Sequence, residues 1–335
     1  NYLATQQDRR GVQIALISSV AEAYFSYAAD NENLMLSEDK LKLYTETYNK
    51  VKRTYESGLS TEIDLLRVKT QVSVAERDIA TYQQLVAQDK NALDFLLSTP
   101  TPEELLPVNL TEIQAVREIS PGLSSEVLLY RPDILRAENL LRAANADIGA
   151  ARAAFFPRIS LTAAVGTASS DLSNLFGKGS SYWSYAPQLV MPIFDARVWS
   201  AHRASKVQKE IMLNTYQQSI QSAFREVADV LAILGSVDDQ VVAQETYVQD
   251  TKRIYELADY RLQMQIDNSL SVLDAQRSYR TAQQALVELH RFKRVSEVKL
   301  YSVLGGGWVQ EVPPEEPAQD SGEQLAQAAP ADNVK

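Results

Sequence analysis

The sequence predicts a mainly helical protein with two long antiparallel coiled-coil hairpins and one β-hairpin between them. The first observation is an internal repeat, because Gln13–Ser98 and Ile220–Gly305 align without a gap at a constant offset of 207 positions. The second is an apolar period of about 3.5 residues through both copies, which is typical of a coiled-coil seam. The third is a change to a period of 2 between the copies, which indicates strands. A repeat this long is a duplicated supersecondary block rather than a solenoid unit.

These patterns divide the chain into six sections. They are a first helical hairpin (1–100), an irregular connection (101–122), helices leading to the strands (123–157), the β-hairpin (158–194), a second long helical hairpin (195–307) and a tail (308–335). The connection contains three prolines. The tail is rich in Pro, Ala and Gln and has six acids against one lysine from Glu311 to Lys335, a composition typical of disorder.

The first helical hairpin should begin with a helix from near Asp8 to about Tyr55. Gly58 breaks the apolar pattern, and Ser60-Thr61 followed by two acids is typical of an N-cap with an acidic first turn. The return helix should stop at Thr99-Pro100, because a proline disfavours helical backbone in the residue before it.

The helical section that follows should start at Ser124 and end before Pro157. We expect a bend at Tyr130-Arg131-Pro132-Asp133, with Arg131 or Asp133 capping a nearby helix end. Many of its central residues are small, so neighbouring helices can approach it closely.

The predicted strands are Arg158–Thr167 and Tyr182–Phe194, joined by a polar loop. Each is about ten residues long, which is the length that a tilted strand needs to cross a bilayer. The residues that we expect to face lipid are Ile159, Leu161, Val165, Leu189 and Met191. Trp183 and Tyr185 stand where an interfacial aromatic belt would lie. An ordinary amphipathic hairpin on a soluble core is the alternative, and the strands alone do not decide between the two.

In the second helical hairpin, Asp195 should cap a helix from about Ala196 to Leu262, roughly 100 Å long at the usual rise per residue. After a turn, the return helix Leu270–Leu304 should end at a run of three glycines. It covers only about half of the outgoing length. We expect the section Asp133–Phe156 to line the other half, so that two shorter helices stack end to end beside one long helix.

The composition excludes several classes of site. Cysteine is absent, and the two histidines, His202 and His290, lie in polar helical surroundings far apart in the chain. We therefore expect no metal site, no cofactor and no catalytic group. The net charge is −10 and the body of the chain is mixed in sign, which argues against a nucleic-acid partner. No run approaches the roughly 20 apolar residues of a spanning helix. The start at Asn1 is interpreted as a cut within a larger protein.

Several stretches resemble the outer-membrane factor (TolC-like) family, in the branch that serves resistance-nodulation-division multidrug efflux pumps and has lipoprotein members. They are Leu128–Ile134, Ala137-Glu138, Ala143–Pro157 with Ile159–Leu161, Pro192–Asp195 and Val272–Ser278. The match covers Gln13–Gly307, and these motifs follow one another in the same order as in the family.

The resemblance implies a homotrimeric channel-tunnel, with a twelve-stranded β-barrel in the lipid of the Gram-negative outer membrane and a helical tunnel through the periplasm. Its implied function is that of a passive export duct, opened at its periplasmic tip by an adaptor (membrane fusion protein) and an inner-membrane pump. A periplasmic coiled-coil scaffold or tether without a pore is the alternative. The sequence departs from the family in lacking the first strand pair and the segment with the signal peptide and, often, a lipidated cysteine. It also has Gln265 where the family usually has a turn glycine.

The resemblance also places a periplasmic gate at the tip of the second hairpin. Leu270 and Asp274 are four residues apart on one helix face, so threefold symmetry would produce a ring of leucines and a ring of aspartates. The alternative is a coiled-coil contact for Leu270 and a helix-dipole role for Asp274. Arg67, at the position equivalent to Asp274, either bridges the hairpins or is solvated. Arg67, Gly58 and Arg277 are the expected tip contacts.

Overall fold

The computed structural model describes residues 2–113, 125–170, 175–264, 266–267 and 269–306. The tail predicted for 308–335 and part of the connection predicted for 101–122 lie outside these residues, as does Gln265. The elements are α1 (Tyr2–Glu56), α2 (Glu62–Leu97), α3 (Pro132–Ala153), β1 (Arg158–Thr167), β2 (Ser181–Val190), α4 (Ala196–Gln263) and α5 (Ser269–Val303). Three short 3-10 segments, Glu103–Leu105, Leu110–Glu112 and Ser125–Tyr130, lie between α2 and α3.

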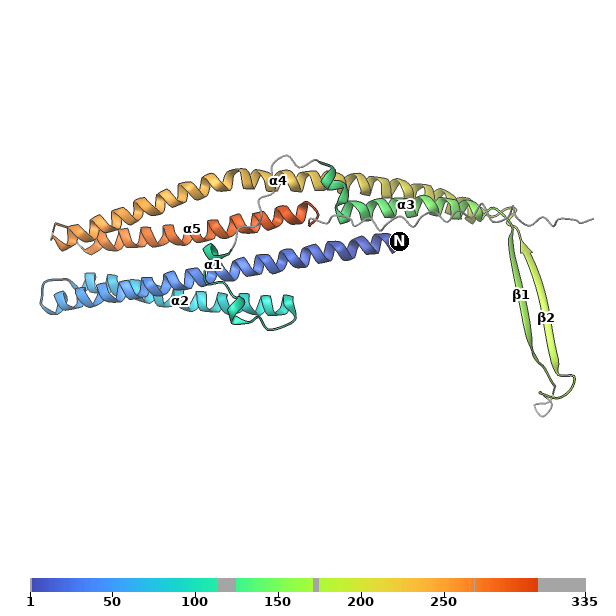
Figure 1. Cartoon of the computed structure of the whole chain (residues 1–335), viewed down its shortest axis with the longest axis horizontal. Coiled ribbons are helices and arrows are strands. Elements are labelled where there is room, and N and C mark those ends of the chain that lie inside the picture. The colour runs from blue at the N-terminus through green and yellow to red at the C-terminus, as the bar shows by residue number, and fades with distance from the viewer. Residues whose placement is uncertain (1, 114–124, 171–174, 265, 268, 307–335) are drawn as a thin grey trace, which may run out of the picture.

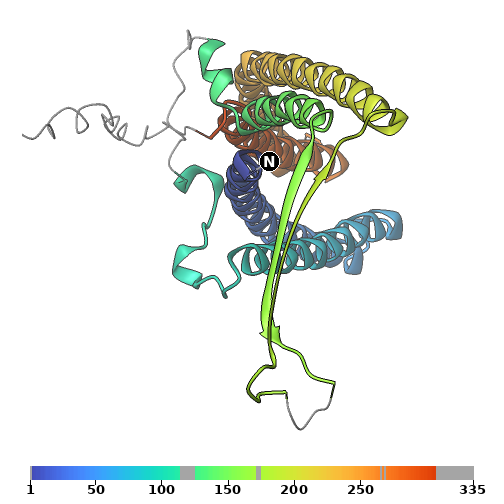
Figure 2. The same cartoon turned by 90° about the vertical axis from the view of Figure 1, so that its right-hand side faces the viewer.

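Two helical hairpins, α1–α2 and α4–α5, lie side by side with both turns at the same end of the molecule (Figure 1). The helix α3 packs on the other half of α4, so α3 and α5 follow one another along one long helix, as the sequence predicted. The antiparallel strands β1 and β2 extend from the opposite end, away from the helices (Figures 1 and 2). Among the described elements, the two strands pack only on each other.

The coiled-coil period is visible along α4, where every seventh residue lies on the seam. These residues are Ala223, Val230, Val237, Gln244, Thr251 and Ala258. The two polar members make hydrogen bonds: Gln244 Nε2 donates to the carbonyl of Ala282 on α5 at 2.9 Å, and Thr251 Oγ1 donates to the carbonyl of Tyr247 at 2.8 Å. Polar seam positions are therefore tolerated, because their polar atoms are not buried without partners.

Contacts of α1 with both α2 and α5 join the two hairpins into one wall. Towards the tips, a cluster combines α1 and α2 with one residue of α5: Tyr44, Val51, Val68, Ala75 and Leu273. Farther from the tips, a second cluster joins α1 to α5 and to the 3-10 segment Leu110–Glu112: Phe25, Ala28, Ala29, Leu110, Val287 and Val298. Burial on both sides of α1 positions α5 between the two outgoing helices.

Arg131 ties the start of α3 to the end of α5. Its side chain is 8% exposed, its Nη1 donates to the carbonyl of Val303 at 2.8 Å, and its Nη2 lies 2.7 Å from a carboxylate oxygen of Glu226 on α4. The Nε and Nη2 atoms also bind both oxygens of Asp133, at 3.0 and 2.8 Å. The prediction that Arg131 caps a helix end is confirmed, and the capped end is the C-terminus of α5.

The chain leaves α5 through Gly305 and Gly306, whose φ values of 91° and 72° favour glycine. Space also demands glycine at Gly306, because a Cβ there would lie 2.6 Å from Cγ1 of Ile14 on α1. Helices α1, α3, α4 and α5 therefore meet around Arg131.

Replacing Arg131 with alanine should destabilise the protein by about 2 kcal/mol, since it leaves the buried carbonyl of Val303 and two carboxylates without their donor. Chemical denaturation of the intact protein measures this loss. Arg142→Ala is the matched control on the same helix, because Arg142 pairs with Glu138 at the surface, where its side chain is 69% exposed. The control should cost at most about 0.5 kcal/mol. Equal losses for the two variants would contradict a structural role for the junction.

Two element boundaries differ from expectation. The helix α1 begins at Tyr2 rather than near Asp8, with buried Ala4 and Gln7 on its inner face. The strand β2 ends at Val190 rather than at Phe194, so Met191 lies just beyond the ladder. The partner of Val190 is Arg158, which follows Pro157, and Pro192 has no N–H to donate. The two prolines cannot donate a backbone N–H to a ladder, so the strand pairing ends between them, at Arg158 and Val190.

Candidate functional site

The first hairpin tip is closed by local hydrogen bonds. Gly58, with φ 75°, ends α1, and the N–H of Leu59 donates to the carbonyl of Thr54 at 2.9 Å. Thr61 is the N-cap of α2 in a capping box: its Oγ1 accepts from the N–H of Asp64 at 3.2 Å, and its own N–H donates back to Oδ2 of Asp64 at 3.3 Å. Hydrogen bonds donated to Oδ2 of Asp64 by the Thr61 hydroxyl, at 2.7 Å, and by the Thr61 N–H lower the pKa of Asp64, with a smaller contribution from the charge of Arg67. The acid therefore stays ionised at the start of α2.

The second hairpin tip depends on Asp267. Arg261 Nε lies 3.4 Å from one of its carboxylate oxygens, and Ser271 Oγ donates to the other at 2.8 Å. The N–H of Ile266 donates to the carbonyl of Arg261 at 2.9 Å, which closes the turn after α4. The last turn of α4 is thereby held to the first turn of α5.

The sequence-predicted gate residues lie on one exposed face of α5. Leu270 is 38% exposed, and Asp274 and Arg277 are exposed and form an ion pair at 3.4 Å. Four of the residues between them are buried: Val272, Leu273, Ala275 and Gln276. Val272 and Ala275 pack on α4, and Leu273 packs on α1 and α2, so two flanks of α5 are covered within the chain. The face of Leu270, Asp274 and Arg277 is the uncovered one.

Arg67 is exposed on α2 near the first tip. Within the part of the chain that the structure describes, its charge acts on Asp64 of the same hairpin, and no ion pair joins it to the second hairpin. A shallow cleft beside Gly58 and Asp64 is also lined by Leu262 of α4, so the two tips adjoin each other. Arg67 does not contribute to that cleft.

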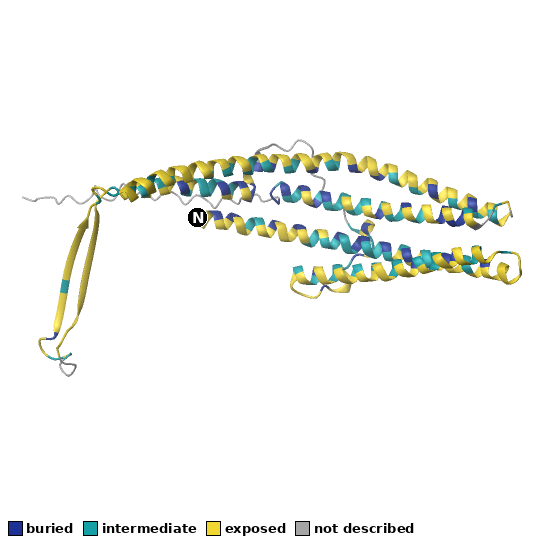
Figure 3. Ribbon diagram, turned by 180° about the vertical axis from the view of Figure 1, so that it is seen from behind, coloured by how far each residue is buried: buried dark blue, intermediate teal, exposed yellow. Residues whose placement is uncertain are grey.

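At the opposite end of the molecule, the strand register sorts side chains by polarity. Ile159 is opposite Leu189, Ala163 is opposite Tyr185, and Val165 is opposite Trp183. Because opposed residues share a face of an antiparallel pair, one face is apolar and aromatic. The other face carries the polar pairs, among them Ser160 opposite Gln188. Both faces of the strands are exposed in the single chain (Figure 3).

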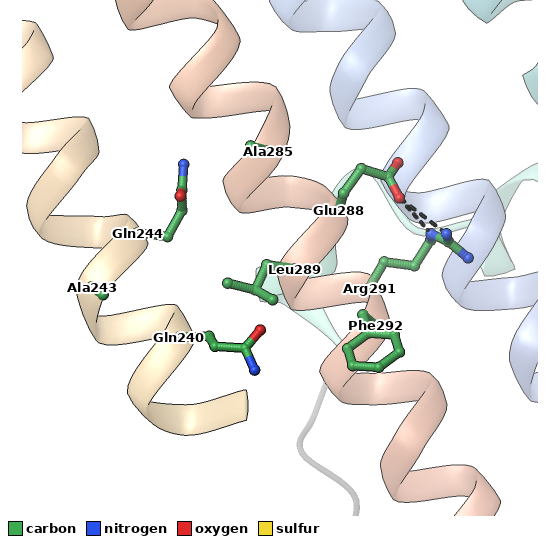
Figure 4. A pocket seen from close by; sticks show the side chains of 8 residues that line it. All are labelled: Gln240, Ala243, Gln244, Ala285, Glu288, Leu289, Arg291 and Phe292. Atoms are coloured by element: carbon green, nitrogen blue, oxygen red, sulfur yellow. Dashed lines mark hydrogen bonds and ion pairs between the residues drawn. The ribbon is translucent and has the colours of Figure 1, made fainter. Parts of the chain in front are cut away.

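A groove between α4 and α5 lies midway along the second hairpin (Figure 4). Gln240 and Gln244 line it from α4, and Leu289 and Phe292 line it from α5. Glu288 and Arg291, on its rim, form an ion pair at 3.0 Å and extend towards α1 (Figure 4).

Two polar contacts across the first hairpin had no signal in the sequence pattern. Lys40 and Asp78 pair at 2.8 Å with side chains 13% and 18% exposed, and the carboxyl groups of Asp30 and Asp89 adjoin each other. None of these residues occupies a position of the apolar repeat. Only the pairing of α1 with α2 brings them together, so a search for periodicity cannot find them.

Within the described residues, no cluster of three or more acidic or histidine side chains could hold a metal ion. Among the same residues, none of the helices combines the length and apolar character needed to cross a bilayer.

Comparison with known proteins identifies the family. The model of the family described as outer membrane efflux proteins matches residues 1–99 and 123–306, which is most of the chain. The chain belongs to this family. Among its relatives, the probable efflux pump outer membrane protein TtgC of Pseudomonas putida is 44% identical over 311 residues. The cation efflux system protein CusC of Escherichia coli O157:H7 is 40% identical over 312 residues.

Solved structures of other family members share the fold. A structure of CusC matches with a TM-score of 0.80 at 40% identity, covering 92% of this chain and 72% of that one. The open state of the MtrE outer membrane channel of Neisseria gonorrhoeae matches with a TM-score of 0.79 at 35% identity, covering 91% and 69%. The alignments cover 92% of this family member but 64% of TtgC and 68% of CusC, so the chain spans slightly less than two thirds of the length of TtgC.

Proposed function

We propose that this chain is the outer-membrane channel-tunnel component of a tripartite multidrug efflux system, and that it works as a homotrimeric passive duct. The strands join a barrel in the outer membrane of a Gram-negative cell, and the helices form the wall of a periplasmic tunnel. A periplasmic adaptor and an inner-membrane resistance-nodulation-division pump open the duct at the hairpin tips. The protein performs no chemistry on its cargo.

The observation that carries this proposal is the β-hairpin. Two ten-residue strands with one apolar and aromatic face extend from the helices and pack on nothing else among the described elements. Exposed strand edges and an exposed apolar face are unfavourable in water, and closure into a barrel within lipid removes both problems. Ile159, Leu161, Val165 and Leu189 are then the lipid-facing residues, with Trp183 and Tyr185 at the interface.

The uncovered face of α5 supports a gate at this tip. Threefold symmetry makes one leucine ring from Leu270 and one carboxylate ring from Asp274. The leucines narrow the passage sterically, and the carboxylates attract and hold cations. Arg277 offsets part of the aspartate charge, because the two side chains pair within each protomer. Opening requires the three tips to move apart.

Planar-bilayer recordings of the intact, detergent-extracted protein test the proposed function. A channel gives stepwise ion conductance. A coiled-coil tether without a pore gives none, even when its tip residues are replaced. Absence of conductance from both the wild-type protein and its tip variants would therefore favour the tether.

A further inference from the structure

A pair of carboxyl groups joins the two helices of the first hairpin, beside α5. Asp30 on α1 and Asp89 on α2 lie within hydrogen-bonding distance of each other. Oδ2 of Asp89 is shielded from solvent, and among the described residues no N–H or O–H group donates to it. Neighbouring carboxyl groups can bond to each other only when one of them carries a proton, because ionised carboxylates only accept. A hydrogen bond between Asp30 and Asp89 therefore requires a proton on one of the two carboxyl groups.

The cation that acts on both members of the pair does not neutralise it. Arg291 of α5 acts on both Asp30 and Asp89, but its Nε and Nη2 both contact one oxygen of Glu288 at 3.0 Å. The charge of Glu288 acts on Asp30 in the opposite sense to that of Arg291. Three carboxyl groups thus face one guanidinium, and ionising all three leaves an excess of negative charge in the seam.

The other titratable groups around the pair supply no compensating positive charge. Lys90, next to Asp89 in the sequence, directs its ammonium group towards Glu103 at 3.6 Å. On the same two helices, burial raises the pKa of Tyr27 and of Tyr82, and the charge of Asp30 raises that of Tyr82 further. Both phenols are therefore neutral at physiological pH and add no charge beside the pair.

We propose that Asp30 and Asp89 share one proton and form a pH-sensitive clasp between α1 and α2, beside α5. With the proton in place, one carboxyl group donates to the other and the seam is closed. Loss of the proton places two negative charges in contact, which loosens the seam. The proposal concerns the packing of the helical wall, so it holds whether or not the chain conducts ions.

The acidity of the pair agrees with this geometry. Burial and the neighbouring charge of Asp30 raise the pKa of Asp89 to about 7, and burial raises the pKa of Asp30. Aspartate in an unfolded chain titrates near about pH 3.9. Between about pH 4 and about pH 7 the folded protein therefore holds a proton that the unfolded chain has lost. Its stability falls as the pH rises through this window and levels off above it.

Infrared difference spectroscopy of the intact protein in detergent tests the shared proton directly. The wild type should show the carbonyl stretch of a protonated carboxyl group, lost with a midpoint near about pH 7, and Asp89→Asn should lack it. The matched control is Asp78→Asn, which removes a carboxylate from the same helix pair. Burial acts to raise the pKa of Asp78, but hydrogen bonds from Lys40 and Arg77 outweigh it and lower that pKa, so the control should keep the band. No titrating band between about pH 6 and about pH 8, or a band that survives in Asp89→Asn, would overturn the proposal.

Stability provides a second readout that does not depend on assigning a band. Between about pH 5 and about pH 7, the equilibrium constant for unfolding should rise up to tenfold per pH unit more steeply in the wild type than in Asp89→Asn. The asparagine amide can donate to Asp30, so the variant should match or exceed the wild type at about pH 8. Where Asp89→Asn does not fold, Asp30→Asn serves instead, and parallel pH profiles for wild type and variant would refute the clasp.

Discussion

Replacing Leu270 and Asp274 together with alanine should enlarge the single-channel conductance of the intact channel severalfold and abolish its block by divalent cations. The double variant removes both the apolar ring and the carboxylate ring, which restrict passage by size and by charge. The helix should stay folded, because α5 is held by the buried residues Val272, Leu273 and Ala275 rather than by its exposed face. Planar-bilayer recordings measure the conductance. Uptake of a large antibiotic such as vancomycin reports the same opening in cells.

The control for the gate removes the same two residue types away from the tips. Asp229 and Leu231 are both exposed on α4, and Asp229→Ala with Leu231→Ala should leave conductance and cation block unchanged. Arg67→Asp should loosen the tip if Arg67 contacts a neighbouring protomer, since it would add negative charge there. Wild-type conductance and cation block in the Leu270 and Asp274 double variant, with assembly intact, would place the constriction elsewhere.

Introducing arginine on the apolar face of the β-hairpin should be the most destabilising single change in the protein. Leu161→Arg or Leu189→Arg should lower the free energy of unfolding in lipid by about 2–4 kcal/mol, because each places a charge against hydrocarbon near the middle of the membrane. Thr162→Arg is the matched control, since Thr162 adjoins Leu161 but points to the opposite face. It should cost much less. Unfolding of the reconstituted protein in denaturant measures all three, and equal penalties on the two faces would argue against a membrane barrel.

Periodicity alone determined the helices and their pairing. A seven-residue repeat specifies which face of a helix is buried without specifying which atoms cover it, so the seam of α4 followed from spacing. The helix caps at Thr61 and Asp195 could also be predicted from the sequence, because the groups that form a cap are three or fewer residues apart. The last residue of β2 was predicted wrongly, because the extent of a strand depends on where its partner strand ends. That end was set by the proline preceding Arg158 and by Pro192.

Contacts between distant segments were decided only by the tertiary structure. The sequence indicated that Arg131 would cap a helix, but the capped end, at Val303, is reached only when α3 stacks on α5. Leu270 and Asp274 could be assigned to one face from their spacing. That this face is uncovered depends on α1, α2 and α4 occupying the others. The proton of Asp89 is the clearest case. An aspartate is an ordinary acid until burial and a second carboxyl group, brought close by the pairing of two helices, make its charged form costly, and no local pattern records that proximity.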